Sequence, residues 1–135
     1  MIKRILHLAR VVHSVMRESL IKPATRSDRW PTVRKHFLEK NPKCAACGGT
    51  TLLQCHHCLP FNDDPSKELD PNNLVTLCMG TTEEHHLSIG HGSDFHHFSE
   101  TVREDAAQLL AHPEQFQEIA EKSKANRKPN QPGVV

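Results

Sequence analysis

Metal-binding side chains gather in one stretch of this 135-residue chain, residues 44–91. Cys44 and Cys47 form a C-x-x-C pair followed by two glycines, which allow the tight turn that aims both sulfurs at one ion. Two adjacent histidines, His56 and His57, come shortly after this pair. Adjacent imidazoles suit a division of labour, because one can hold a metal while the other stays free to take a proton. The pattern therefore predicts a fold built around metal sites.

The sequence offers few large side chains from which to build a core. Only 36% of residues are hydrophobic, 4% are aromatic and tyrosine is absent. A chain of this length makes one domain with a modest core, and metal binding is one way to reinforce it. The five cysteines are an odd number and lie among eleven histidines. That pattern favours a zinc site in a reducing compartment over a disulfide framework.

Basic charge is concentrated in the first third of the chain. Residues 1–43 hold eleven Lys and Arg against three Asp and Glu, a net charge of +8 within a chain of net charge +1. Segregated positive charge is expected of a protein that meets phosphates, because neutralising them releases counterions. The alternative is a solvated basic helix face. The candidate phosphate contacts, just upstream of the cysteine pair, are Arg26, Arg29, Arg34 and Lys35.

The apolar stretch near the N-terminus, residues 5–20, is interrupted by His7, Arg10, His13 and Arg17. It matches neither a signal sequence nor a membrane span. We therefore expect a cytoplasmic protein that has no membrane partner.

Apolar periodicity and turn residues predict an α+β fold that is mainly helical. The expected elements are helices over residues 3–20 and 30–39, strands over 51–55 and 74–77, and helices over 82–90, 101–111 and 113–125. Thr101 and Glu104 fit a capping box. Residues 60–73 form a polar loop whose acidic side chains, Glu68 among them, we expect to be solvated or to cap turns. The proline-rich residues from 126 onward should be disordered.

The order of motif residues along the chain is specific. The motif positions are Arg26-Ser27, Trp30, Val33-Arg34, Phe37-Leu38, Asn41-Pro42, Cys44 to Gly48, His56-His57, Pro60-Phe61, Glu68 to Asp70, Asn73-Leu74, Leu77-Cys78, His86, Gly90-His91 and Val102 to Asp105. This series resembles the HNH endonucleases of the ββα-metal (His-Me finger) fold, of the small bacterial and phage-associated type. The resemblance implies a small ββα-metal core with a structural zinc site, flanked by N-terminal and C-terminal helices.

The resemblance also implies hydrolysis of DNA phosphodiester bonds, by nicking or by double-strand cleavage. His57 is similar to the general base that deprotonates water, and Asn73 to the residue that holds the loop and orients the base. His56, where many relatives have Asp, and His86 resemble ligands of one catalytic divalent cation: Mg²⁺, Mn²⁺, Ni²⁺, Co²⁺ or Zn²⁺. Spacing leaves His91 open between a third ligand or phosphate contact and a surface residue.

The structural zinc has two possible ligand sets. One consists of Cys44, Cys47, Cys78 and His85, with His85 standing where relatives place a cysteine. The other consists of Cys44, Cys47, Cys55 and Cys58. We favour the first set, because Cys55 and Cys58 flank the catalytic pair and would compete for the same ion. As free cysteines they would pack as small apolar residues.

The expected organisation is an N-terminal basic helix and linker over residues 1–25, a nuclease domain over 26–112, a C-terminal helix over 113–125 and a disordered basic tail over 126–135. DNA is the expected partner, in a bacterial or phage-infected cell, and a homodimer or a recruiting protein could assist.

One alternative function is a non-catalytic, zinc-stabilised DNA-binding module with a degenerate nuclease centre. The residues His57, Asn73 and His86, which such a module would have lost, are intact. Another is a zinc or cysteine hydrolase of small molecules, which the basic first third argues against.

Overall fold

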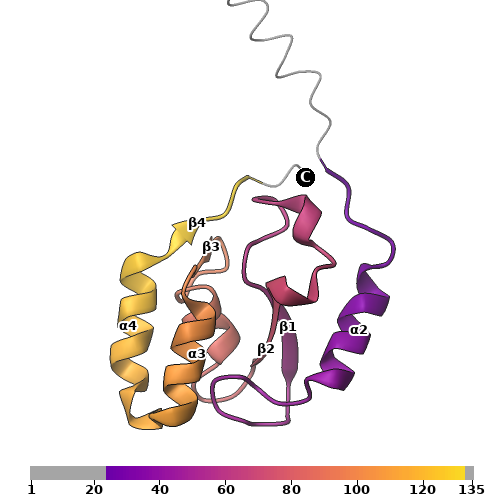
Figure 1. Ribbon diagram of the computed structural model, residues 1–135. Coiled ribbons are helices and arrows are strands. Elements are labelled where there is room, and N and C mark those ends of the chain that lie inside the picture. Colours follow the sequence, from indigo (N-terminus) through magenta and orange to yellow (C-terminus); the bar gives the residue numbers. More distant parts are fainter. Residues whose placement is uncertain (1–23, 133–135) are drawn as a thin grey trace, which may run out of the picture.

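The computed structural model describes residues 24–132, and the helix expected over residues 3–20 lies outside the described residues. Within this range the elements are α2 (Trp30–Lys40), β1 (Leu53–His57), η1 (Pro65–Lys67), η2 (Pro71–Asn73), β2 (Leu74–Cys78), η3 (His86–Gly90), β3 (His97–Phe98), α3 (Val102–Ala111), η4 (Pro113–Gln115), α4 (Phe116–Asn126) and β4 (Lys128–Pro129). They make a small α+β protein, as predicted. In Figure 1, α2 lies on one side of β1 and β2, and α3 and α4 lie on the other. No helix among residues 24–132 is long and apolar enough to cross a bilayer.

The two central strands form an antiparallel pair. The register runs from Leu53 opposite Cys78 to His57 opposite Leu74, so pairing continues through both adjacent histidines. The strand predicted over residues 51–55 therefore starts and ends two residues later than expected. Every residue of β2 is buried, whereas β1 buries only His56. β2 is therefore the more buried strand of the pair, and β1 is the more exposed one.

The loop between the two strands contains two short 3₁₀ turns. Asp64 and Asp70 precede these turns, and each carboxylate accepts a hydrogen bond from the backbone N–H two residues later. These two acidic residues cap turns, as predicted. Glu68 does not follow the prediction, because its side chain is only 4% exposed. Its carboxylate accepts hydrogen bonds from the backbone N–H of Ser27 at 2.9 Å and from Arg26 at 3.3 Å.

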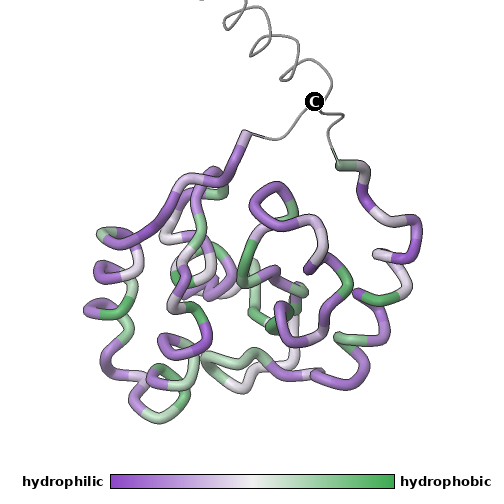
Figure 2. The backbone as a smooth tube through the Cα atoms, turned by 45° about the horizontal axis from the view of Figure 1, so that its top comes forward, coloured by the Kyte–Doolittle hydropathy of each residue, from purple (hydrophilic) through white to green (hydrophobic). Residues whose placement is uncertain are grey.

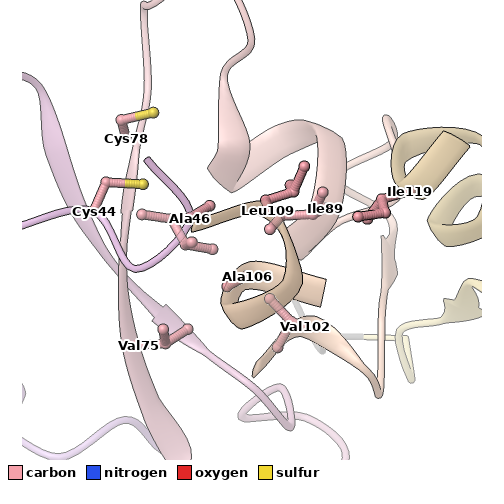
Figure 3. Close-up of a cluster of buried hydrophobic side chains, with 10 residues drawn as sticks. Cys44, Ala46, Val75, Cys78, Ile89, Val102, Ala106, Leu109 and Ile119 are labelled. Carbon is pink, nitrogen blue, oxygen red and sulfur yellow. The ribbon is translucent and has the colours of Figure 1, made fainter. Parts of the chain in front are cut away.

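A single buried cluster of apolar side chains joins the central strands to the helices on one side. Ile89 of η3, Leu109 of α3 and Ile119 of α4 meet in it (Figure 3). Cys44 and Cys78 lie at its edge with both thiols directed to the same side. Apolar residues occur as short runs along the chain and not as one long segment (Figure 2). The core is therefore small, and two of its members are cysteines.

The first turn of α3 differs from the predicted capping box. Thr101 precedes this helix but makes no side-chain capping hydrogen bond to it. Its hydroxyl instead donates to the carboxylate of Asp105 at 2.8 Å. The Asp105 side chain is fully buried, and Lys122 of α4 donates to its other oxygen, also at 2.8 Å. The buried carboxylate thus ties α4 to α3, which a capping box would not do.

The prediction of disorder from residue 126 is wrong for residues 126–132. Asn126 ends α4, and β4 then pairs antiparallel with β3. Gly92 lets this segment approach closely, because a Cβ atom there would lie 2.9 Å from both the Ser123 carbonyl oxygen and the Arg127 Cβ. Arg127 also donates to the Gly92 carbonyl at 2.7 Å. Tertiary contacts of this kind order a segment whose composition alone suggests a tail.

Candidate metal centres

Three histidines from different parts of the fold meet at one point. His56 comes from β1, His86 begins η3 and His91 follows its last residue. One nitrogen of each lies within 4.8 Å of the others, so the cluster could hold a metal ion. The Nε2 atoms of His86 and His91 are 3.2 Å apart. Two nitrogen ligands, each about 2.0–2.1 Å from one tetrahedral ion, would be separated by about 3.3 Å, close to this distance.

The π-helical geometry of η3 explains how His86 and His91 reach the same ion. They are five residues apart, a spacing that an α-helix would place on different faces. A π-helical turn, with its i to i+5 pattern, brings such residues onto one face. Gly90 completes the approach, because a Cβ atom there would lie 3.2 Å from Cε1 of His56. The structure therefore places His91 in the cluster, where its spacing in the sequence had left it open.

All three imidazoles are held in the neutral form. Burial, together with the neighbouring His91, lowers the pKa of His86 to about 4. Burial likewise lowers the pKa of His91, and it lowers the pKa of His56 well below the usual value. His91 donates from Nδ1 to the His97 carbonyl at 2.7 Å, which leaves the lone pair on Nε2. Neutral imidazoles with converging lone pairs suit a divalent cation.

Two buried nitrogens of this cluster, Nδ1 of His86 and Nε2 of His56, have no hydrogen-bond partner among the described residues, and the second bears on metal binding. Nε2 of His56 is fully buried and makes no hydrogen bond. A buried polar atom without a partner is costly, and native structures rarely leave one unexplained. Coordination of a cation would satisfy it. The donor set and this unpaired atom together fit a metal ion.

Four other side chains form a second cluster: Cys44, Cys47, Cys78 and His85. Nδ1 of His85 lies 3.7 Å from the Cys44 sulfur and 3.2 Å from the Cys78 sulfur. The sulfurs of Cys47 and Cys78 are 4.0 Å apart, and no cysteine in the described range forms a disulfide. A tetrahedral zinc with Zn–S bonds of about 2.3 Å would separate its ligand atoms by roughly 3.6–3.8 Å. The cluster is consistent with a zinc site.

The charges in this second cluster also favour a cation. Burial opposes ionisation of Cys44, but its hydrogen bond with His85 and hydrogen bonds from nearby backbone groups together lower the pKa of Cys44 to about 6. Burial similarly opposes protonation of His85, yet the same hydrogen bond and the nearby Cys78 raise the pKa of His85 to about 9. A thiolate is therefore available at neutral pH, and zinc coordinates thiolates. Among residues 24–132, Cys55 and Cys58 do not belong to this cluster. The alternative four-cysteine set is not the one that the structure assembles.

The two clusters meet at consecutive residues. His85 belongs to the cysteine cluster and His86 to the three-histidine cluster. His85 directly precedes η3, and its Nε2 lies 2.7 Å from a carboxylate oxygen of Glu83. A single peptide bond therefore fixes the position of one cluster relative to the other.

A cleft of about 240 Å³ opens beside the three histidines. Its lining includes Arg26, His56, His57, His86, His91 and Asn130. His57 stacks on Trp30 with ring centroids 4.3 Å apart, and its Nε2 lies 2.9 Å from the Glu68 carbonyl oxygen. A carbonyl only accepts hydrogen bonds, so Nε2 is the donor and the lone pair of neutral His57 is on Nδ1. Burial lowers the pKa of His57 below its usual value.

Asn73 holds the loop on which this arrangement depends. Its Oδ1 accepts from the Leu59 N–H at 2.8 Å, and its Nδ2 donates to the Leu59 carbonyl at 3.0 Å and the Lys67 carbonyl at 3.3 Å. The side chain is buried at the last position of η2, directly before β2. It therefore joins the residues after β1 to the turns that carry Glu68.

The four basic residues predicted to contact phosphates occupy two settings. Arg26 lines the cleft, is paired with Glu68 and lies over the Phe61 ring at 4.8 Å. Arg29 directly precedes α2, Arg34 and Lys35 lie in the middle of this helix, and all three are exposed and do not line the cleft. Of the four, only Arg26 could touch a group bound next to the three histidines.

Two contributors to the site were not predicted from the sequence. Asn130 lines the cleft from the segment expected to be disordered, and the carbonyl of His97 in β3 orients His91. Neither carries a local sequence signal, because each acts through a tertiary contact. Comparisons of the chain with known protein families, with curated proteins and with solved structures found no match.

Proposed function

We propose that this chain is a metal-dependent HNH-type endonuclease of the ββα-metal fold that hydrolyses phosphodiester bonds in DNA. The observation that carries the proposal is one cleft lined both by a three-histidine cluster and by a separately held histidine, His57. The order of elements supports it, because two antiparallel strands are followed by the helical turn that bears His86. The contacts of Asn73 with Leu59 and of His57 with the Glu68 carbonyl support the roles proposed for these two residues.

In this proposal His57 is the general base. Its Nε2 is committed to the Glu68 carbonyl and its Nδ1 is free to accept a proton from water. The lowered pKa keeps the imidazole unprotonated at neutral pH. Stacking on Trp30 and the bond to Glu68 fix the plane of the ring, so the lone pair has one direction. The base is thus oriented before substrate binds.

The remaining residues bind and orient the phosphate. His56, His86 and His91 would hold a divalent cation, which when bound would stabilise negative charge on the scissile phosphate and the leaving oxygen. Arg26 is placed in the same cleft by Glu68 and can contact a phosphate oxygen. Cys44, Cys47, Cys78 and His85 would hold a structural zinc at the edge of the core.

Cleavage of supercoiled plasmid by the purified chain tests this function directly. We expect relaxation or linearisation that EDTA abolishes and that added Mn²⁺ or Mg²⁺ restores. His57→Ala should abolish cleavage while metal content and DNA binding stay near those of the unsubstituted chain. His56→Ala should abolish cleavage and also reduce the affinity for the added cation. His36→Ala, which removes an exposed histidine from α2, is the matched control and should cleave normally.

Three results would contradict the proposal. Cleavage by the His57→Ala variant would remove His57 from the role of base. Equal loss of the added cation in His57→Ala and His56→Ala would make both histidines ligands and leave the site without a separate base. DNA binding without any cleavage would favour the non-catalytic module.

A further inference from the structure

The C-terminal segment forms one wall of the cleft. After β4, the backbone N–H of Asn130 donates to the His96 carbonyl at 2.9 Å. The backbone N–H of Gln131 lies 3.4 Å from a carboxylate oxygen of Asp63, in the loop across the cleft. Asn130 itself lines the cleft together with the histidines. This segment is therefore part of the site and not an appendage to it.

The amide of Asn130 has a defined orientation. Its Nδ2 donates to the Phe95 carbonyl at 3.1 Å, which assigns the other amide atom as the oxygen. That oxygen, Oδ1, is buried and has no hydrogen-bond partner. A buried amide carbonyl of this kind is costly unless a donor meets it. The cleft wall thus offers an unused acceptor.

His86 supplies the matching donor when it is a metal ligand. Its Nε2 faces His91 Nε2 at 3.2 Å, so Nε2 is the atom directed to the ion. Coordination requires a lone pair on Nε2 and therefore places the proton on Nδ1. Nδ1 of His86 is buried and has no partner in the structure. His91 differs, because its Nδ1 already donates to the His97 carbonyl.

We propose that Asn130 is a positioning residue whose Oδ1 accepts the Nδ1–H of His86 when His86 holds a metal ion. The inference rests on the proposed three-histidine metal site. Of the residues lining the cleft, three have buried polar atoms without a partner: His56, His86 and Asn130. The His56 nitrogen is satisfied by the ion, which leaves one donor and one acceptor to satisfy each other. Metal-binding histidines commonly donate their second N–H to an oxygen in this way.

Titration of the zinc-loaded full chain with Co²⁺, followed by visible absorption, tests the inference without relying on activity. Asn130→Ala should weaken Co²⁺ binding roughly 10- to 100-fold, the usual effect of losing such a partner. Asn130→Asp keeps an acceptor but loses the donor to Phe95, and it should bind Co²⁺ nearly as well as the unsubstituted chain. Gln131→Ala changes the next, exposed side chain and is the matched control. It should leave Co²⁺ binding unchanged.

A second measurement follows the proton on Nδ1 of His86 by NMR. In the Co²⁺ protein the ring N–H resonances of the ligands are shifted by the paramagnetic ion. Asn130→Ala should make one of these protons exchange faster with water, whereas Asn130→Asp should keep it protected. Equal loss of affinity in the Ala and Asp variants would assign the effect to the Phe95 hydrogen bond and overturn the inference. So would an Asn130→Ala variant with unchanged affinity and unchanged exchange.

The controls separate this inference from the proposed function. Co²⁺ binding that is absent, or that persists in His86→Ala, would overturn the metal site and the inference together. Co²⁺ binding that needs His86 but is indifferent to Asn130 would overturn the inference alone.

Discussion

The side chain of Asn73 holds the loop between β1 and β2 in place. Its amide makes three hydrogen bonds to backbone groups of Leu59 and Lys67, all within the loop that positions His57. The amide accepts one hydrogen bond and donates two, whereas a serine or threonine hydroxyl could donate only one. The role of Asn73 in orienting the base stays a prediction from its place in the motif, and its hydrogen bonds show that it holds the loop.

Asn73→Ala should therefore slow cleavage strongly without removing either metal. Loss of buried hydrogen bonds typically costs about 1–3 kcal/mol where a partner is left unsatisfied, and we expect a decrease in unfolding free energy of that size. Denaturant unfolding and plasmid cleavage measure the two effects. Asn72→Ala is the control, because Asn72 is exposed and its side chain makes no hydrogen bond in the structure. A cleavage rate unchanged by Asn73→Ala would show that the loop does not orient the base.

The environment of His57 predicts the pH dependence of cleavage. Burial lowers its pKa below about 6.5, and a bound cation would push it in the same direction. A base must be unprotonated, so the rate should stay level as pH falls through 6.5 and decline only below it. Trp30→Ala should move this decline to higher pH, because it exposes the ring that Trp30 covers. Single-turnover cleavage rates across the acid range measure the shift, and a decline at or above the usual histidine pKa would contradict the prediction.

Glu68 marks the limit of prediction at the scale of single residues. In the sequence it is one acidic residue in a polar loop and was expected to be solvated or to cap a turn. In the structure it is buried and paired with Arg26 and the Ser27 backbone, about forty residues earlier in the chain. The backbone carbonyl of Glu68 also accepts a hydrogen bond from Nε2 of His57. Local composition describes none of these contacts, because all of them are made across the fold.

At the scale of elements, the positions of helices and strands followed from periodicity, whereas their geometry did not. Leu74–Cys78 and Trp30–Lys40 lie within one residue of the predicted ranges. The helix predicted over residues 82–90 forms at the right place but as the π-helical turn η3. A five-residue spacing of histidines could have signalled it, yet α-helical periodicity was assumed. The assignment of His91 to the three-histidine cluster depends on this π-helical geometry.

The cysteine cluster makes a prediction about folding. Cys44 and Cys78 belong both to the cluster and to the buried core, so loss of the ion should be felt throughout the domain. Structural zinc contributes about 10–16 kcal/mol in zinc-finger peptides, more than most domains have in total stability, about 5–15 kcal/mol. Cys78→Ser should lose about one zinc per chain and lower the melting temperature sharply.

The free cysteines provide the matched controls. Cys55→Ser and Cys58→Ser should retain the zinc, and each should cost about 1–2 kcal/mol as half-buried polar substitutions. Zinc analysis by mass spectrometry and thermal unfolding distinguish the cases. Retention of zinc by Cys78→Ser with its loss from Cys55→Ser would mean that the ligand set differs from the one assembled in the structure.

At the scale of the whole molecule, the segment after α4 was the largest error of prediction. Pro129 and Pro132 and the absence of large apolar residues suggested a disordered tail. Pairing of β4 with β3, the Arg127 contact to Gly92 and the Asn130 contacts to Phe95 and His96 order it instead. Each of these joins residues at least thirty positions apart in the sequence. Composition could not reveal them, because the ordering comes from what the rest of the fold presents.

The distribution of charge predicts how DNA binding responds to salt. If DNA contacts Arg26 and the basic face of α2, affinity should fall steeply with salt, with a log–log slope of about −0.9 for each phosphate contact. Replacing Arg26, Arg29, Arg34 and Lys35 with Ala should flatten that slope. Lys124→Ala changes an exposed residue of α4, on the other side of the central strands in Figure 1, and should not. An unchanged slope in the fourfold variant would place the DNA elsewhere, with the basic C-terminal residues as the next region to test.

If both clusters hold ions, as proposed, the peptide bond between His85 and His86 couples the two centres. Cys44 and Cys78 also belong to the buried core, whereas no residue of the three-histidine cluster does, so we expect loss of zinc to disturb the histidine centre more than loss of the second cation would disturb the cysteine centre. During biogenesis, zinc would therefore have to be acquired first. A mild chelator should remove the ion of the histidine centre reversibly. A chelator strong enough to take zinc from the thiolates should inactivate the protein irreversibly. A cell short of zinc would then make an inactive protein even when the second cation is abundant.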